Sequence, residues 1–328
     1  MDKKYYSAQT IFNASIMLFF GALFLIGTFS DKAIADFLYS PDSQAVKLAT
    51  SVGVYPFFAA SVFFLGALFE RTVHSQKKKT VRYILCAACI VFAVFSGFIG
   101  GGALLDRDCL GAVFPALNRN VPAISAAAVT GFYPVFFVGY RMAPKSADKA
   151  LAKRIVCLLL IMLTAFVAMQ VLKNVFHRPR YRTAVIGYGG IGFVPWYTPF
   201  SGASGYIAVL GISKGEFRSF PSGHSILSIS VVYMIQSLTW FFPKLKEKAL
   251  QLSTGGFFFG VFIMIIKNDT RSALPHRRLS RRNDRHHALA RTYTHSAQDI
   301  AEADGSVRRK RFFAGAYPVK IKRIRERS

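Results

Sequence analysis

The sequence predicts an all-α fold, a polytopic transmembrane helical bundle of about seven spans. Hydrophobic residues make up 52% of the 328 residues, and they are concentrated in long runs. Uncharged apolar runs of about 18 residues or more are typical of membrane-spanning helices. Every second connection between the runs is basic, which is the pattern expected when alternate connections lie on the cytoplasmic side of a membrane.

Seven runs meet this length criterion and carry no charged residue. They are Ile11–Phe29, Leu48–Phe69, Tyr83–Leu105, Pro122–Tyr140, Ile155–Leu172, Ser225–Phe242 and Ala249–Ile266. The first run is too long for the core of a signal peptide, and no clear cleavage site follows it, so we interpret it as a retained anchor. A last helix, which would return the chain to the inner side, is missing from the expected set.

The basic residues predict the orientation of the bundle. They assign the N-terminus and three connections to the cytoplasm: Lys3, Lys4, Arg71, Lys77, Lys78, Lys79, Arg82, Arg141, Lys145, Lys149, Lys153, Arg154, Lys244, Lys246 and Lys248. The loops Ser30–Lys47, Asp106–Val121 and Lys173–His224 then face outward. We therefore expect a multi-pass protein of the cytoplasmic membrane.

Composition divides the chain into three parts. Residues 1–150 hold the N-terminal transmembrane helices, residues 151–266 form a core with the outer loop 173–224, and residues 267–328 form a basic tail. The tail carries 17 Lys and Arg against 6 Asp and Glu, so it supplies +11 of the net charge of +26. The remaining charge lies mostly in the inner loops, where anionic headgroups favour it. No nucleic-acid-binding fold accompanies this charge, so we expect no nucleic-acid partner.

Several cations follow the fifth run, on the side that the orientation assigns to the outside. Lys173 and Arg180 are seven residues apart, so they would share one face if the helix continued. Pro179 predicts that this helix ends at about Arg178. Basic residues often mark helix ends and extend to headgroups, but cations on the outer side depart from the positive-inside rule. The departure favours a functional role for this cluster.

The stretch Thr183–Phe220 is rich in glycine and aromatic residues and is too polar to span a membrane. Because Trp and Tyr favour the lipid–water interface, we expect it to lie on the outer leaflet. A plain interfacial loop and a lid over a site both fit this pattern.

The segment Pro221-Ser222-Gly223-His224 opens the sixth run. Pro and Ser are suited to the start of a helix, and glycine lets the backbone approach a ligand closely. The free amides of a first helical turn attract anions, and a histidine there can exchange a proton near neutral pH. A helix cap with an incidental histidine is the ordinary alternative.

The combination of Lys173-x6-Arg180, a gap of about 40 residues and Pro-Ser-Gly-His resembles the type 2 phosphatidic acid phosphatase family, which is related to vanadium haloperoxidases. The resemblance covers residues 155–266. It implies a phosphatase core within the helical bundle. It also implies that phosphate oxygens are bound by Lys173, Arg180, Ser222 and Gly223, and that His224 protonates the leaving alcohol. Tyr181 stands where the family has proline.

The family also has a third motif, Ser-Arg-x5-His-x3-Asp, whose histidine is the nucleophile. After the seventh run, Arg271 is well placed, but His276 comes one residue too early. Ser280-Arg281-x5-His287 has the right spacing, yet Arg291 replaces the aspartate. If the motif is carried over in part, Arg271 binds phosphate and His287 is the nucleophile.

No single register satisfies the third motif, because His295-x3-Asp299 also lacks an arginine at the required distance. Partial matches arise easily in a tail so rich in Arg and His. Two explanations of residues 267–328 stay open: a native basic extension that is disordered or bound to headgroups, and translation in a shifted reading frame. The abrupt change of composition favours the shifted frame.

The resemblance implies a membrane phosphatase that acts on lipid phosphate or diphosphate monoesters through a phosphohistidine, with no metal and no cofactor. Its expected partners are the lipid phosphate substrate and the surrounding lipids. The alternative is a catalytically inactive lipid-phosphate-binding membrane protein, or a truncated or frameshifted product. A transporter is suggested only by the number of helices, and no charge inside the runs supports it.

Overall fold

The computed structural model describes residues 3–37, 44–144, 149–185 and 191–269. The regular elements within these residues are all helical, as the sequence predicts. In chain order the α-helices are α1 Lys3–Phe37, α2 Gln44–Val73, α3 Lys79–Leu104, α4 Leu110–Val113, α5 Val121–Ala127, α6 Tyr133–Met142, α7 Lys149–Phe176, α8 Tyr181–Val185, α9 Ala203–Leu210, α10 Gly223–Ile229, α11 Val231–Ser237 and α12 Ala249–Asp269. These residues all belong to one compact unit, Met1–Ala273. The domain boundaries at 150 and 266 stay predictions.

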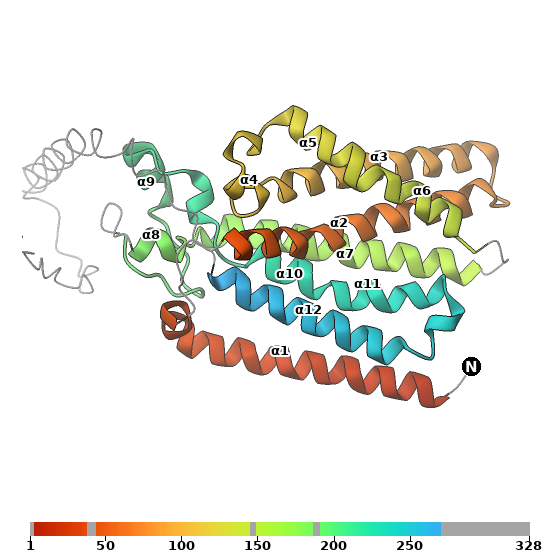
Figure 1. Ribbon diagram of the computed structural model, residues 1–328, viewed down its shortest axis with the longest axis horizontal. Coiled ribbons are helices and arrows are strands. Elements are labelled where there is room, and N and C mark those ends of the chain that lie inside the picture. Colours follow the sequence, from red (N-terminus) through yellow and green to blue (C-terminus); the bar gives the residue numbers. More distant parts are fainter. Residues whose placement is uncertain (1–2, 38–43, 145–148, 186–190, 270–328) are drawn as a thin grey trace, which may run out of the picture. The chain divides into compact units, whose positions relative to one another are not determined.

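The long helices run alongside one another, and the short helices α4, α8 and α9 gather at one end of them (Figure 1). Six helical segments among the described residues are long and apolar enough to cross a membrane. They are Ala8–Phe37, Lys47–Val73, Lys79–Leu104, Val121–Met142, Ala150–Ala184 and Ala249–Ile266. The prediction of an all-α polytopic bundle is therefore confirmed, and the chain has the character of a multi-pass membrane protein.

The expected helix over Ser225–Phe242 differs from the other spans, because it is divided into α10, α11 and the 3-10 helix η5 (Leu238–Trp240). The division falls at Ser230, whose hydroxyl donates to the carbonyl of Ile226 at 2.7 Å. Serine hydroxyls that bond back to the preceding turn bend helices. Each piece is shorter than a membrane span, although together they extend over most of the expected run, from Gly223 to Trp240.

The expected span Pro122–Tyr140 is also interrupted, by the π-helical turn η2 (Ala128–Phe132) between α5 and α6. Pro134 lies just after this turn and has no N–H to continue the α-helical pattern. Within the turn, the Gly131 carbonyl accepts a hydrogen bond from the Tyr55 hydroxyl at 2.8 Å. Helix α2 thus contacts the interrupted helix at the turn.

Helix α2 is the centre of the bundle and contacts α3, α6, α7, α10 and α12. Of its apolar window, 61% is buried, whereas the figure for α1 is 6%. Glycines permit its closest crossing, with α6: a methyl group at Gly66 would overlap the Phe136 carbonyl, and one at Gly139 would overlap the Phe63 carbonyl. Small residues at such crossings let transmembrane helices approach closely.

Helix α1 is longer than the expected run, because it continues to Phe37 into the predicted outer loop Ser30–Lys47. The hydrogen bonds that join α1 to the rest of the bundle, among the described residues, lie near the two ends of the helix. Gln9 donates to Ser253, Asn13 accepts from Gln236, and Asp31 accepts from Arg178. Most of the α1 surface between these ties is exposed and apolar, as suits a helix facing lipid.

Candidate functional site

The segment before α10 and the C-terminal end of α7 meet at the end of the bundle that carries α4, α8 and α9 (Figure 1). Lys173, on the last turns of α7, lies next to Gly223, the first residue of α10. A Cβ atom at Gly223 would lie 2.9 Å from the Lys173 Nζ and 3.1 Å from the Met169 Sδ. The absence of a side chain at Gly223 therefore makes room for the lysine ammonium against the backbone.

Ser222 is the N-cap of α10, and its hydroxyl accepts a hydrogen bond from the Ser225 N–H at 3.4 Å. The Ser225 hydroxyl also donates to the Ser222 hydroxyl, at 2.9 Å. Serine is favoured at this position because its oxygen satisfies a free amide of the first turn. The capping fixes the turn in which His224 lies.

His224 is half-buried, and its Nε2 lies 3.1 Å from the Sγ of Cys109 in a hydrogen bond whose direction depends on the tautomer. Cys109 is fully buried at the start of α4. The thiol therefore orients the imidazole from a loop more than a hundred residues away in the chain. The sequence predicts the outer loop Asp106–Val121 only as a connection between spans.

Helix α7 ends at Phe176, two residues before the predicted end at Arg178. His177 has a φ of 45°, a left-handed conformation that breaks the helix before Pro179. Lys173 and Arg180 consequently do not share one helical face, and Arg180 lies beyond the turn.

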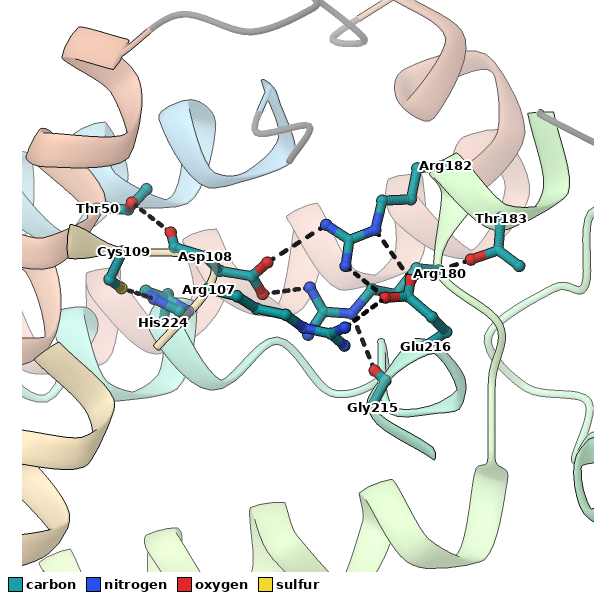
Figure 2. A network of polar contacts seen from close by, with 10 residues as sticks. All are labelled: Thr50, Arg107, Asp108, Cys109, Arg180, Arg182, Thr183, Gly215, Glu216 and His224. Carbon is teal, nitrogen blue, oxygen red and sulfur yellow. Dashed lines mark hydrogen bonds and ion pairs between the residues drawn. The ribbon is translucent and has the colours of Figure 1, made fainter. Parts of the chain in front are cut away.

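Arg180 is held by acceptors from two other segments (Figure 2). Its side-chain Nη1 forms an ion pair with Asp108, and its Nε donates to the Gly215 carbonyl at 3.1 Å. Its backbone N–H donates to the Glu216 carbonyl at 2.7 Å. Asp108 is buried, and its own carbonyl accepts from the Thr50 hydroxyl at 3.1 Å. Arg180 thus links the segment after α7 to the α3–α4 loop and to η4 (Lys214–Phe217).

Glu216 is the second carboxylate of this network (Figure 2). Arg182 donates to both of its oxygens, at 2.9 and 2.7 Å, and Arg107 pairs with it at 2.9 Å. The Thr183 hydroxyl donates to it at 3.1 Å. Arg182 also reaches Asp108 at 3.3 Å. Three guanidinium groups therefore surround two carboxylates, which leaves this network one positive charge in excess.

Burial and neighbouring charges shift the pKa values of Glu216 and Arg107, two members of the network that lie outside the membrane-spanning segments. Burial by itself would raise the pKa of the Glu216 carboxyl, but the hydrogen bonds and charge of Arg182, with the charges of Arg180 and Arg107, lower it below its usual range. Burial lowers the pKa of the Arg107 guanidinium, and Glu216 opposes that effect. The carboxylate is therefore held in its charged form.

Arg218 is a cation of the site that the sequence motifs do not include. Its Nη2 donates to the Gln170 side chain at 2.7 Å, and its Nε is buried without a hydrogen-bond partner among the described residues. Gln170 lies one turn before Lys173 on α7. A buried N–H without an acceptor carries a free-energy cost, which an anion at this position would remove.

The segment over Thr183–Phe220 is tied to α1 by Asp31. The Arg178 Nη2 pairs with Asp31 at 2.6 Å, and the Trp196 N–H donates to the same carboxylate at 3.2 Å. The Trp196 ring packs between Phe24 and Phe220, with centroid distances of 4.8 and 4.9 Å. Through Trp196, these contacts link Phe220, the residue immediately before Pro-Ser-Gly-His, to α1.

Two predicted site residues, Arg271 and His287, lie outside the described residues. Among the described residues, no three His, Cys, Asp or Glu side chains come together in a way that could hold a metal ion. The described site therefore consists of Lys173, Ser222, Gly223, His224 and Arg218, beside the network that holds Arg180.

Residues 154–267 match the family model of the PAP2 superfamily. The chain contains a PAP2 superfamily domain. The resemblance to the type 2 phosphatidic acid phosphatases is thereby confirmed at the level of the superfamily, whose members are generally phosphatases. No curated protein and no solved structure gives a significant match to the chain.

The PAP2 domain does not contain all the residues that shape its site. Arg107, Asp108 and Cys109 lie on the α3–α4 loop, outside residues 154–267, yet they contact Glu216, Arg180 and His224. The sequence indicates Arg107 and Asp108 only weakly, as adjacent charged residues in an outer loop, and it does not indicate Cys109. Glu216 and Arg218 lie close before Pro-Ser-Gly-His, and that proximity was the available clue.

Proposed function

We propose that the protein is an integral membrane phosphatase that hydrolyses lipid phosphate or diphosphate monoesters on the outer face of the cytoplasmic membrane. The observation that carries the proposal is the approach of the Lys173 ammonium to Gly223, inside a PAP2 superfamily domain. The two motif segments are 50 residues apart in sequence, and a tetrahedral anion between them would contact both.

In the proposed mechanism, phosphate oxygens contact the Lys173 ammonium, the Ser222 hydroxyl, the Gly223 N–H and the Arg218 Nε. These groups would stabilise the charge of the transferring phosphoryl group. A histidine nucleophile attacks phosphorus while the ester P–O bond breaks, and His224 gives its proton to the leaving oxygen. Water then attacks the phosphohistidine and releases phosphate. His287, with Arg271 as a further phosphate ligand, is our candidate for the nucleophile.

Arg180 takes a different part in the proposal. Its guanidinium is engaged by Asp108 and Gly215, so it contributes positive charge and fixes the loop around the site. A phosphate oxygen could share the guanidinium with Asp108, because an arginine carries five N–H donors. No nucleic acid and no cofactor enters this scheme, and the partners are the lipid substrate and the surrounding lipids.

The orientation and the substrate class are parts of the same proposal. Basic connections assign the opposite end of the bundle to the cytoplasm, so the site would face outward. A membrane-embedded bundle favours a substrate whose chains stay among lipids while its headgroup enters the cationic site. Phosphatidate, phosphatidylglycerol phosphate, polyprenyl diphosphate and phosphorylated lipid A all have this form.

The test is phosphate release by the purified full-length chain from these four lipids. His224→Ala should lower release by about 10²- to 10⁴-fold, the range for loss of a general acid. The matched control is His74→Ala, because His74 is exposed at the opposite end of α2. Unchanged turnover in His224→Ala would refute the proposed role.

A catalytically inactive lipid-phosphate binder is the second candidate, and the incomplete third motif favours it. Such a protein would bind the same lipids without releasing phosphate. Binding without turnover by wild type, lost in Lys173→Met, identifies this case. The coding DNA after codon 266 gives an independent check, since a shifted frame that encodes Arg-x5-His-x3-Asp would identify a frameshifted product.

A further inference from the structure

A groove of about 690 Å³ lies between α2, α3 and α7, away from the candidate active site. Its inner part is lined by aromatic and aliphatic side chains, among them Phe57, Ile99 and Phe166. On α7 it extends from Lys153 to Phe166, while Lys173 lies close to the other end of that helix. Lys153 and Lys173 are 20 residues apart on α7. At a rise of about 1.5 Å per residue they are separated by roughly 30 Å, which is the thickness of the hydrocarbon core.

The groove is long enough to pass through one leaflet of the hydrocarbon core. The thirteen steps from Lys153 to Phe166 correspond to about 20 Å of helix. One leaflet contributes half of a hydrocarbon core of roughly 30 Å, or about 15 Å, so a lipid chain that enters beside Lys153 would lie inside the groove through the whole of that leaflet. An apolar groove of this length, opening at a helix end, suits an acyl chain.

The mouth of the groove is cationic. Arg71 and Lys77 after α2, and Lys153 at the start of α7, line this end, and no Asp or Glu occurs among the described lining residues. Both lysines are exposed, and the Arg71 Nη1 donates to the Pro144 carbonyl at 3.1 Å. The nearest carboxyl in sequence, Glu70, is buried and contacts His74 at 3.2 Å. The charge at the mouth therefore complements an anionic headgroup.

We propose that this groove binds an anionic phospholipid, with a chain between α2, α3 and α7 and its phosphate at Arg71, Lys77 and Lys153. This lipid belongs to the leaflet opposite the candidate active site and is not the substrate. The inference does not depend on the proposed phosphatase activity, because it rests on a different surface of the bundle.

The test is native mass spectrometry of the full-length chain in detergent, titrated with dioleoyl phosphatidylglycerol or dioleoyl phosphatidylcholine. The Lys173→Met background removes binding at the candidate active site from both titrations. Phosphatidylglycerol should bind at least tenfold more tightly. The double variant Lys77→Gln/Lys153→Gln should weaken its binding by roughly 30-fold, the effect of two cations at a lipid surface.

The control is Lys244→Gln/Lys246→Gln, which removes the same charge from exposed residues outside the groove, in a connection also assigned to the cytoplasm. Ala88→Phe should fill the groove and weaken both lipids, with folding checked by circular dichroism. Equal binding of the two lipids by the background protein would overturn the proposal. Equal losses in the two double-lysine variants, or unchanged binding in folded Ala88→Phe, would also overturn it.

Discussion

Two groups of cations lie at the same end of the bundle, and they are held in different ways. Arg107, Arg180 and Arg182 are paired with the buried carboxylates Asp108 and Glu216. The second group lies at the two motif segments: the Lys173 ammonium lies against Gly223, and Arg218 bonds to the neutral Gln170. The first group has the character of a scaffold, whereas the second presents donors that an anion could use.

The difference separates two roles that a basic motif combines. Removing a cation from the second group should affect chemistry more than stability. Removing a carboxylate from the first group should affect stability first, since it leaves buried guanidinium groups without a counter-charge.

Among variants of the two groups of cations and their partners, the largest effect is expected for Lys173→Met. Loss of one charge-stabilising donor typically lowers turnover by about 10²- to 10³-fold, and Met keeps most of the apolar stem. Initial rates of phosphate release from phosphatidate in detergent measure the change. Lys214→Met is the control, because Lys214 is exposed on η4 at the same end. A fall equal to that of Lys214→Met would remove Lys173 from the site.

Glu216→Gln tests the scaffold. The substitution leaves Arg107 and Arg182 facing a neutral amide, and breaking a buried ion pair costs about 3–5 kcal/mol. A lower free energy of unfolding in denaturant titrations in micelles measures this cost. The exposed Glu247→Gln removes the same charge and should have almost no effect. If both variants unfold alike, the network does not stabilise the fold.

Acidification should reproduce part of this loss in wild type. Because the pKa of Glu216 is lowered from its ordinary value of 4.5, its stabilisation is fully present above pH 4.5. It is lost as the pH falls below 4.5 and through the lowered pKa. Thermal unfolding of wild type should become steeply pH-dependent there, and that of Glu216→Gln less so. Identical slopes would contradict the assignment of the shift to Glu216.

The smallest effect is expected for Cys109→Ala, which removes the thiol beside His224. One hydrogen bond of about 1 kcal/mol corresponds to roughly fivefold in rate. The alkaline limb of the pH–rate profile, where a general acid loses its proton, should also move, since the thiol positions the imidazole. Cys109→Ser restores a hydrogen-bonding group and should recover most of the activity. A Ser variant as slow as Ala would indicate that Cys109 acts only through packing.

Hydropathy predicts the fold well because an uncharged run of sufficient length has few alternatives to a spanning helix. The same property is silent on Ser225–Phe242, where serine hydroxyls divide a run that is apolar on average. Nor does it predict the π-turn before Tyr133, where a proline follows and Tyr55 of α2 bonds to the Gly131 carbonyl. Composition therefore predicts that a helix is present, whereas single hydrogen bonds decide whether the helix is continuous.

The candidate site is predictable to the extent that its motifs are local. Pro-Ser-Gly-His and Lys-x6-Arg identify the segments that meet, but the spacing is silent on which cations are paired. Asp108 lies 72 residues from Arg180, so no local pattern reports their contact. Nor does any motif include Arg218, which becomes evident only from its buried Nε.

Because Gly223 lies against the Lys173 ammonium, a substitution at Gly223 changes the position of that charge. An added methyl group there would meet the Lys173 Nζ at 2.9 Å, and the end of a lysine side chain moves aside easily. Gly223→Ala would therefore fold almost normally while displacing the ammonium by a fraction of an ångström. Few single substitutions shift a charge so slightly without removing it, so this position offers a graded measure of how closely any anion bound here depends on where that charge lies.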